Sequence, residues 1–187
     1  MDKLNANSDI EQRIIFMKNN SEKMEHLHRF MIENKKSKML IFLRLKHKCR
    51  KMHDKMGKKG FETTWISGAK AQSARESAIR AFKRGDVKIM FATDVAGRGI
   101  HVDDIEYVIQ YDMPDRGFED YVHRIGRTGR AGKKGIAISY FVPQLDSHHA
   151  RTLIRVLENC NQPVPEKLKG MRVTSDRRNG MGRRCHQ

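Results

Sequence analysis

The stretch Val87-Lys-Ile-Met-Phe-Ala-Thr-Asp-Val-Ala-Gly-Arg-Gly-Ile100 joins a short apolar run to a turn that contains two glycines. The run from Val87 to Ala92 has the length and the apolar content of a buried strand. Polar residues and glycines follow from Thr93 onward, where the chain leaves the strand. Because loops that follow parallel strands gather ligands at the carboxyl edge of a sheet, we expect a binding loop here. An ordinary strand-to-helix turn explains the glycines but not Arg98, which lies between them.

Five further apolar runs of the same kind lie on either side of this one, and segments with helical periodicity separate them. This alternation of strand and helix is typical of a parallel sheet covered by helices. We therefore predict an α/β domain with a doubly wound, RecA-like layout, in which helices flank a mostly parallel sheet in three layers. The predicted strands are Ile10 to Lys18, Lys38 to Leu43, Phe61 to Ile66, Val87 to Ala92, Ile105 to Tyr111 and Gly135 to Val142.

The helices between these strands are expected to bury apolar stripes rich in methionine, which we interpret as core packing. Ser21 is expected to cap the first helix, Gly60 to end the second and Gly85 to end the third. The predicted inward-facing residues are Met24, Leu27, Phe30 and Met31, then Leu45, Cys49, Met52 and Met56, then Ala74, Ala78 and Phe82. The third helix is predicted over residues 71–83, and two later helices over 116–125 and 147–159.

At 187 residues the chain has the length of one domain with flexible ends. We assign residues 1–20 to a linker and the first strand, and residues 21–168 to the RecA-like domain. From about Lys169 the apolar periodicity is lost among arginines and glycines. Residues 169–187 are therefore predicted to form a basic, disordered tail.

The charge balance of the chain points to polyanionic partners. Its 38 Lys and Arg outnumber 22 Asp and Glu, which gives a net charge of +16. Charge by itself does not separate RNA from DNA or anionic lipid. Cys49, Cys160 and Cys185 are far apart, so neither a zinc site nor a disulfide framework is indicated. The cysteine pattern fits a reducing compartment best, so we expect an intracellular protein of the nucleus or cytoplasm. No apolar run approaches the roughly 20 residues of a membrane span, so we expect no membrane partner.

The stretch Tyr121-Val-His-Arg-Ile-Gly-Arg-Thr-Gly-Arg-Ala-Gly132 places an arginine at every third position among glycines. Gly126 and Gly129 are expected to break the helix near Ile125. Arg127 and Arg130 then project from a loop, and forked guanidinium groups match phosphate oxygens. This pattern predicts arginine fingers. The alternative is that these arginines only cap the carboxyl end of a helix or form a solvated basic face.

Together, these two stretches resemble the fifth and sixth motifs of the DEAD-box RNA helicases. His-Arg-Ile-Gly-Arg-Thr-Gly-Arg130 is among the most specific signatures of that family. Further matches follow in the expected order, and the resemblance spans about residues 10–168. The further matches are Leu40-Ile-Phe42 to the fourth motif, Gln72-Ser-Ala-Arg75 to the Q-x-x-R element and Val108-Ile-Gln-Tyr-Asp-Met-Pro114 to the strand after the fifth motif.

The resemblance implies the second of two RecA-like domains that close on ATP and single-stranded RNA, the fragment itself being a monomer. It implies that Arg127 and Arg130 reach ATP phosphates held by the N-terminal domain, and that His123 bridges toward that domain. Gly99 is expected to approach the nucleotide through its backbone, and Arg124 to be structural and to pair with Asp94. The residues implied to border the RNA groove, where they contact phosphates and sugars, are Gly68, Gln72, Arg75, Thr93 and Arg98.

Three positions depart from the family pattern. His101 stands where the family usually has the Asp that binds the nucleotide ribose, so a ribose contact depends on its imidazole. Ser67-Gly68-Ala69 replaces His-Gly-Asp before the Q-x-x-R element, and Leu45 replaces a Thr of the fourth motif. These departures weaken the assignments at those positions only.

The chain has no phosphate-binding loop and no Asp-Glu-Ala-Asp motif. Gly132-Lys133-Lys134 is the nearest approach, but it lacks the upstream Gly and the Ser or Thr that binds Mg²⁺. We therefore expect ATP and Mg²⁺ to be held mainly by the N-terminal domain, and this fragment to be inactive by itself. Two alternatives stay open: a noncatalytic basic RNA-binding module that keeps the fold, and a DNA-directed relative.

Overall fold

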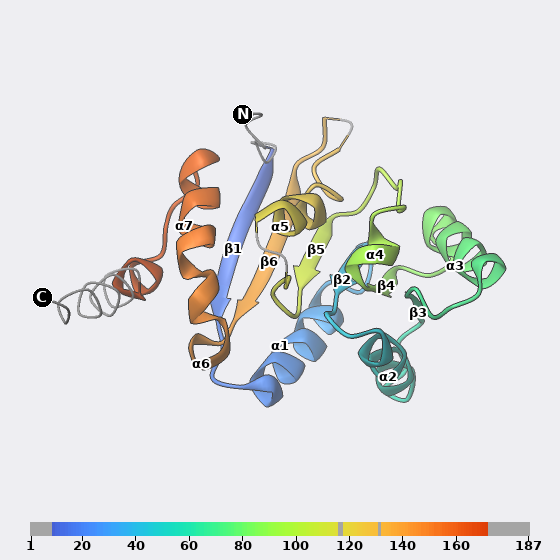
Figure 1. Cartoon of the computed structure of the whole chain (residues 1–187). Helices are drawn as coiled ribbons and strands as arrows, with labels where there is room; N and C mark the ends of the chain where they lie inside the picture. The colour runs from blue at the N-terminus through green and yellow to red at the C-terminus, as the bar shows by residue number, and fades with distance from the viewer. Residues whose placement is uncertain (1–8, 116–117, 131, 172–187) are drawn as a thin grey trace, which may run out of the picture.

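The computed structural model describes residues 9–115, 118–130 and 132–171, which form one six-stranded sheet. The strand order is β1-β6-β5-β2-β4-β3, and all five strand pairs are parallel. Each predicted strand is present and is at most two residues shorter at either end, so the α/β prediction is confirmed (Figure 1). The strands are β1 (Ile10–Phe16), β2 (Met39–Phe42), β3 (Thr63–Ile66), β4 (Ile89–Ala92), β5 (Tyr107–Gln110) and β6 (Gly135–Phe141).

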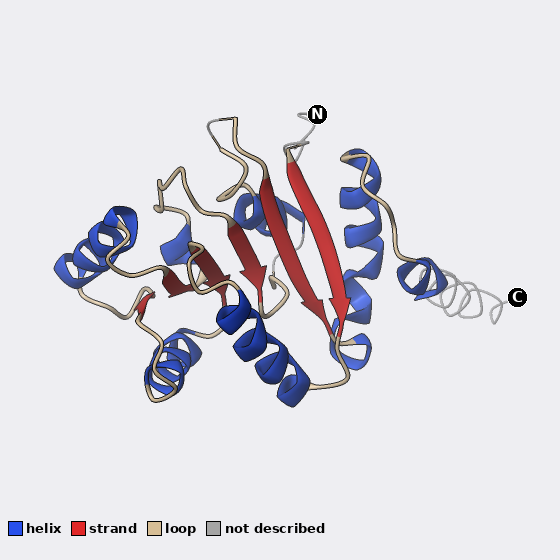
Figure 2. Ribbon diagram, turned by 180° about the vertical axis from the view of Figure 1, so that it is seen from behind, coloured by secondary structure: helices blue, strands red, loops and turns tan. Residues whose placement is uncertain are grey.

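Helices cover both faces of the sheet and make the three layers (Figure 2). One face is covered by α1 (Asn20–Glu33) and α2 (Lys46–Gly57), and we call it the α1/α2 face. The opposite face carries the remaining long helices, and we call it the α4/α5 face. Its helices are α3 (Gln72–Arg84), α4 (Asp94–Gly97), α5 (Phe118–Ile125) and α7 (Ala150–Asn159), with α6 (Pro143–Asp146) and the 3-10 turn η1 (Ser147–His149) leading into α7.

Alternation along the central strands divides the core into two sides. Met39 and Ile41 of β2 pack beneath α1 and α2, whereas Leu40 and Phe42 pack beneath α3 and α4. Successive side chains of a strand point to opposite faces, so a fully apolar strand fills both layers. The methionine stripes are core, as predicted, because Met31, Met52 and Met56 are buried.

The helix ends follow local chemistry that the sequence analysis assigned only in part. Asn19, and not Ser21, caps α1, because its side chain accepts a hydrogen bond from the backbone N–H of Glu22. Gly85 ends α3 in the left-handed conformation that glycine favours, as predicted. Leu45 was expected in the core but lies one residue before α2, and its 39% exposure shows that it is not packed there.

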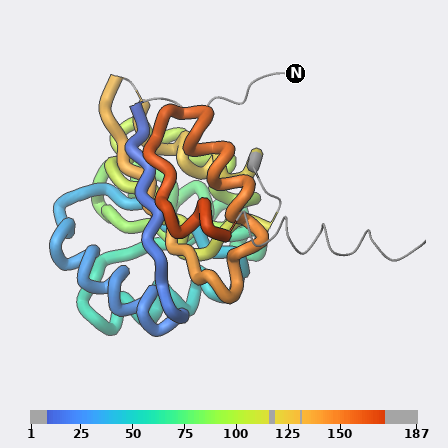
Figure 3. The backbone as a smooth tube through the Cα atoms, turned by 90° about the vertical axis from the view of Figure 1, so that its left-hand side faces the viewer, coloured from blue at the N-terminus to red at the C-terminus, as the bar shows by residue number. Residues whose placement is uncertain are grey.

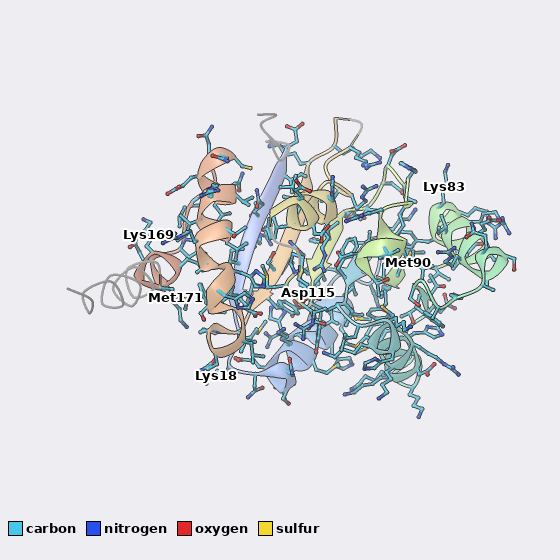
Figure 4. The ribbon with its side chains drawn as sticks, in the orientation of Figure 1. Lys18, Lys83, Met90, Asp115, Lys169 and Met171 are labelled. Carbon is cyan, nitrogen blue, oxygen red and sulfur yellow. The ribbon has the colours of Figure 1, made fainter. Side chains whose placement is uncertain are left out.

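The C-terminal part of the described chain returns to β1. Helix α7 lies beside β1, as two views agree (Figures 1 and 3). Residues 166–171 are helical, so the first three residues of the predicted tail belong to a helix, and residues 172–187 lie outside the described part. Lys169 and Met171 lie near α7, and Met171 packs against the adjoining core (Figure 4). Among the described helices, none has the length and apolar character needed to cross a membrane.

Candidate nucleotide and nucleic-acid interface

The predicted RNA-binding residues gather only in part at the carboxyl ends of β3 and β4. These strands are neighbours in register, with Ile66 opposite Ala92. The backbone N–H of Thr93 donates to the carbonyl of Ile66 at 3.4 Å, so the loops after the two strands begin side by side. Gly68 lies exposed two residues beyond Ile66. The parallel pairing thus brings Gly68 and Thr93 to one edge of the sheet.

Gln72 and Arg75 begin the helix that follows this edge. The side chain of Arg75 donates to the side-chain oxygen of Gln72, and the amide of Gln72 donates to Glu76 at 2.8 Å. The Nε of Arg75 is buried without a hydrogen-bond partner. A buried guanidinium N–H without an acceptor is uncommon in folded proteins, because its desolvation is then uncompensated. Gln72 and Arg75 therefore form a preorganised pair in which Arg75 retains unused donor capacity.

Arg98 does not join that edge. It follows α4, and its guanidinium forms an ion pair with Asp120 of α5 at 2.7 Å. The arginine side chain is 54% exposed, whereas Asp120 is nearly buried. Asp120 was not singled out from the sequence, since a carboxylate in the first turn of a helix is commonplace. Arg98 thus lies in a crevice between α4 and α5, which His123 and Arg127 also line.

The floor of this crevice is a buried arginine. Arg124 donates to both carboxylate oxygens of Asp94, as expected, and one of these contacts measures 2.7 Å. It also donates to the carbonyl of Asp112 at 2.6 Å, and its guanidinium lies 5.2 Å from the ring centre of Phe42. Gly97 allows α4 to pack this closely, because a side chain there would collide with Phe42. Arg124 is therefore a structural cation that fastens α5 to α4 and to the sheet.

A chain of buried polar side chains continues beneath α5, and the sequence analysis did not identify it. Arg124 donates to Gln110 at 3.4 Å, and Gln110 donates to Ser139 at 3.1 Å. Ser139 and Gln12 both bond the hydroxyl of Tyr121. Burial raises the pKa of Tyr121 to about 12. The polar residues Gln110 and Ser139 within otherwise apolar strands were the available sequence signal.

Arg127 and Arg130 lie beyond the end of α5, which stops at Ile125 as predicted. Arg127 donates to the carbonyls of His123 at 3.2 Å and Ile100 at 3.0 Å, and Arg130 donates to the carbonyl of Gly126 at 3.0 Å. The bonds to His123 and Gly126 cap the carboxyl end of α5, which is part of the alternative to arginine fingers that the sequence left open. Both side chains are half-buried, yet neither forms an ion pair with a carboxylate among the described residues.

The electrostatic setting of Arg127 follows from this arrangement. Burial, and secondarily the neighbouring charge of Arg130, lower the pKa of Arg127. Two guanidinium groups thus lie close enough to repel each other, and an anion placed between them would relieve that repulsion. Such a pair is suited to bind phosphate oxygens.

The two arginines lie away from the carboxyl edge of the sheet, because the loop after α5 returns to the amino edge. Thr128 donates to the carbonyl of Ile105 at 2.5 Å, just before β5. Gly129, with a φ of +66°, lies against Ile10 at the start of β1. The predicted nucleotide-binding residues therefore lie on the α4/α5 face and are separated from the edge of the sheet that holds Gly68 and Thr93.

Gly99 and His101 flank the carbonyl of Ile100 that Arg127 contacts. Both residues are exposed, so the structure brings the departure at His101 next to Arg127. Ser67, the other departure in the RNA group, is buried, and its hydroxyl accepts a hydrogen bond from the backbone N–H of Ala69 at 3.3 Å. That bond shapes the turn that carries Gly68.

The donor set of the α4/α5 face fits the phosphates of a nucleotide better than it fits a metal ion. It offers two guanidinium groups that have no carboxylate partner in the described part of the chain, and the exposed backbone of Gly99. Within the described ranges, no group of three or more His, Cys, Asp or Glu side chains is placed to hold a metal ion. The thiols of Cys49 and Cys160 are both buried, and burial is the main cause that raises the pKa of Cys49 to about 12.

Comparison with known proteins supplies the context for this geometry. Residues 22–132 match the model of the helicase conserved C-terminal domain. Over 172 residues the chain is 44% identical to DEAD-box ATP-dependent RNA helicase 40 of Oryza sativa subsp. japonica, covering 91% of this chain and 21% of that protein. The chain spans less than a third of the length of the curated relatives it matches.

Solved structures agree with this match. The RNA helicase Prp28 from Chaetomium thermophilum bound to ADP superposes with a TM-score of 0.78 and 32% identity, over 87% of this chain and 40% of that one. Dbp5 L327V from S. cerevisiae, bound to RNA and ADP BeF3, gives a TM-score of 0.74 and 27% identity, over 84% of this chain and 41% of that one.

Proposed function

We propose that this chain, which belongs to the helicase conserved C-terminal domain family, acts as the C-terminal half of an ATP-dependent RNA helicase. Its similarity to DEAD-box RNA helicases supports this proposal. In this proposal, ATP hydrolysis and the unwinding or remodelling of RNA require an N-terminal RecA-like domain beside it. That domain supplies the phosphate-binding loop and the acidic motif that this sequence lacks. The chain contributes one wall of the nucleotide site and part of the RNA groove.

The observation that carries the proposal is the pair of half-buried guanidinium groups of Arg127 and Arg130, which have no carboxylate partner among the described residues. ATP with Mg²⁺, when bound, supplies the phosphoryl group that is transferred to water. Arg127 and Arg130 stabilise the negative charge that develops on its oxygens, and a finger of this kind contributes roughly 10³ to 10⁵ in rate. Gly99 approaches the nucleotide through its backbone, and His123 faces the N-terminal domain.

His101 has a narrower part in this proposal. Its exposed ring lies next to the contact between Arg127 and Ile100, and it can hydrogen-bond a ribose hydroxyl. It lacks the charge of a carboxylate, so the ribose contact is weaker than the one that an Asp makes. The affinity for nucleotide should accordingly rest more on the phosphate contacts.

The RNA groove occupies the carboxyl edge in this proposal, and Gly68, Gln72, Arg75 and Thr93 contact phosphates and sugars there. Contacts of this kind fix the position of a strand without reading its bases. Arg98 lies between this edge and the nucleotide face, because its ion pair with Asp120 ties it to α5. Arg98 can therefore meet RNA with the nitrogens that Asp120 leaves free.

The proposal is tested with Arg130→Ala in the protein that joins this chain to its N-terminal domain. RNA-stimulated ATP turnover should fall by roughly 10³-fold or more, because the finger stabilises the charge that develops in the transition state. Binding of single-stranded RNA by the 187-residue chain should change less than about twofold, since base-independent contacts lie at the other edge. Arg155→Ala on the exposed surface of α7 is the matched control and should leave turnover unchanged.

Turnover at the wild-type rate in Arg130→Ala would remove the finger role. His101 and Ser67 depart from the DEAD-box pattern and favour a second candidate function, that of a noncatalytic RNA-binding module. That candidate predicts no RNA-stimulated turnover even in the wild-type protein, so the same assay separates the two. Comparing stimulation by RNA and by DNA distinguishes an RNA-directed motor from a DNA-directed one.

A further inference from the structure

A groove of about 560 Å³ lies on the α1/α2 face, on the other side of the sheet from the arginine pair. We call it the α1–α2 groove. Its apolar floor includes the partly exposed Met24 of α1, together with Leu43 after β2 and Met52 of α2, which are buried. Methionine side chains are flexible and polarizable, so a floor that contains them can adapt to apolar groups of different shape. The floor therefore suits side chains such as Leu or Phe.

Lysines line one wall of the groove, at Lys48, Lys51, Lys55 and Lys59. The first three span roughly 10 Å along α2 at 1.5 Å per residue, and Lys59 continues beyond the helix end. Lys48 lies 3.8 Å from Asp112, whereas the other three form no ion pair within the described part of the chain. Like charges four residues apart on a helix repel each other, and a bound carboxylate would relieve that repulsion.

We propose that the α1–α2 groove binds an acidic amphipathic peptide segment of a partner protein. Its apolar side chains would occupy the methionine-lined floor, and its carboxylates would face Lys51, Lys55 and Lys59. A stripe of this length exceeds a small anion and matches two to three turns of a helix or a short extended segment. The lining also contains the carboxylate of Glu25, but four lysines outweigh it, so charge complementarity selects the acidic composition.

Charge also rules out two other occupants. The segment 172–187 carries five arginines against one aspartate, so it would be repelled by the lysine wall. A second copy of a chain with a net charge of +16 meets the same obstacle. RNA would satisfy the lysines but not the apolar floor. Of the two rings in the lining, Tyr111 is only 5% exposed and cannot stack on a base, and the half-buried imidazole of His28 already packs against the ring of Phe61.

The position of the groove makes this binding independent of the proposed catalytic role. The α1/α2 helices and the arginine pair are separated by the sheet, so a partner in the groove leaves the α4/α5 face open. Figure 2 shows α1 and α2 on the near side of the sheet. A partner docked there can recruit the helicase to an assembly while its nucleotide and RNA sites remain accessible.

The test uses the 187-residue chain and fluorescence anisotropy with a labelled amphipathic peptide of about 16 residues, which presents Glu and Asp on one helical face and Leu on the other. Lys51→Glu/Lys55→Glu should raise the Kd of this probe at least roughly tenfold, because it reverses the charge of the wall. The control Lys133→Glu/Lys134→Glu makes the same change in net charge at exposed sites outside the groove and should alter the Kd less than about twofold.

A second variant addresses the floor. Met24→Gln keeps the side-chain length but adds an amide, and it should raise the Kd roughly fivefold. Thermal melts monitored by circular dichroism establish that each variant is folded. Equal binding of a polyglutamate peptide that lacks leucine would overturn the proposal, because charge would then suffice. It would also fail if Lys51→Glu/Lys55→Glu left peptide affinity unchanged, or weakened only binding of a labelled oligouridine.

Discussion

Arg124, Arg127 and Arg130 recur at every third residue, yet Arg124 is neutralised by a carboxylate and the other two are not paired with one among the described residues. Arg124 is 2% exposed, and its guanidinium is held by the carboxylate of Asp94, the carbonyl of Asp112 and the ring of Phe42. Arg127 and Arg130 are half-buried, and their hydrogen bonds to the described residues go to backbone carbonyls. One repeated cationic motif thus contains a structural arginine and two arginines that remain available to an anion.

The helix end at Ile125 causes this division. Arg124 is still within α5, so its side chain points toward the sheet and meets Asp94 at the start of α4. Gly126 follows the helix, and the chain then turns toward the amino edge of the sheet. Arg127 and Arg130 therefore leave the helical register that would have carried them around the axis of α5.

The largest effect on stability is expected from replacing the structural arginine, Arg124. Arg124→Met should lower the free energy of unfolding by about 3 to 5 kcal/mol, because Asp94 and the carbonyl of Asp112 lose a buried cationic donor. Urea unfolding of the 187-residue chain measures this change. Arg127→Met and Arg130→Met should each change the same quantity by less than about 1 kcal/mol. Equal losses at all three positions would erase the distinction between them.

An intermediate effect concerns anion binding by the other two arginines. Tripolyphosphate at ten times its Kd should stabilise the wild-type chain by about 1.4 kcal/mol. Arg127→Met/Arg130→Met should remove most of that gain, because these guanidinium groups have no carboxylate partner of their own within the described residues. Arg155→Met replaces an exposed arginine of α7 and serves as the control, so tripolyphosphate should still stabilise this variant. Full stabilisation of the double variant would show that the anion binds elsewhere.

The smallest effect tests how far the charge of Arg124 reaches. Burial first, then His148 and more weakly Arg124, lower the pKa of His149, although Asp146 and Asp115 oppose the shift. The neutral ring is thus favoured in the fold, and its contribution is complete above the unfolded pKa of about 6.5. Stability should fall slightly as pH drops through that value toward the lowered folded pKa.

His149→Gln should flatten this acid-side slope, which urea midpoints between about pH 5 and pH 8 would reveal. His47→Gln is the control, since His47 is exposed at the start of α2. An unchanged slope in His149→Gln would mean that the pH dependence arises at other groups. A flatter slope in Arg124→Met as well would place part of the effect on the arginine.

Much of the fold was accessible from sequence because its signals are local. Six apolar runs predicted six strands, Gly85 predicted the end of α3, and Gly126 predicted that α5 stops at Ile125. The pairing of Arg124 with Asp94 followed from the family resemblance and is present. The cap of α1 was misassigned to Ser21, since Asn19 and Ser21 are both good capping residues only two positions apart.

Features that depend on packing were not accessible. The ion pair between Arg98 and Asp120 joins residues 22 positions apart, and no local pattern announces it. The return of the Arg127 loop to the amino edge depends on Thr128 bonding the carbonyl that precedes β5. The roles of Arg127, Arg130 and the RNA-edge residues stay predictions until the proposed variants are measured.

The kind of domain, the order of its elements and the arginine-rich segment after α5 could be inferred from the amino acids alone, because these features depend on short-range periodicity and on glycine. Which arginine is neutralised, where the other two lie and which lysines frame a groove emerged only in the folded domain. Burial and the approach of distant charges set those outcomes, and neither quantity exists until the sheet and its two helical layers have assembled.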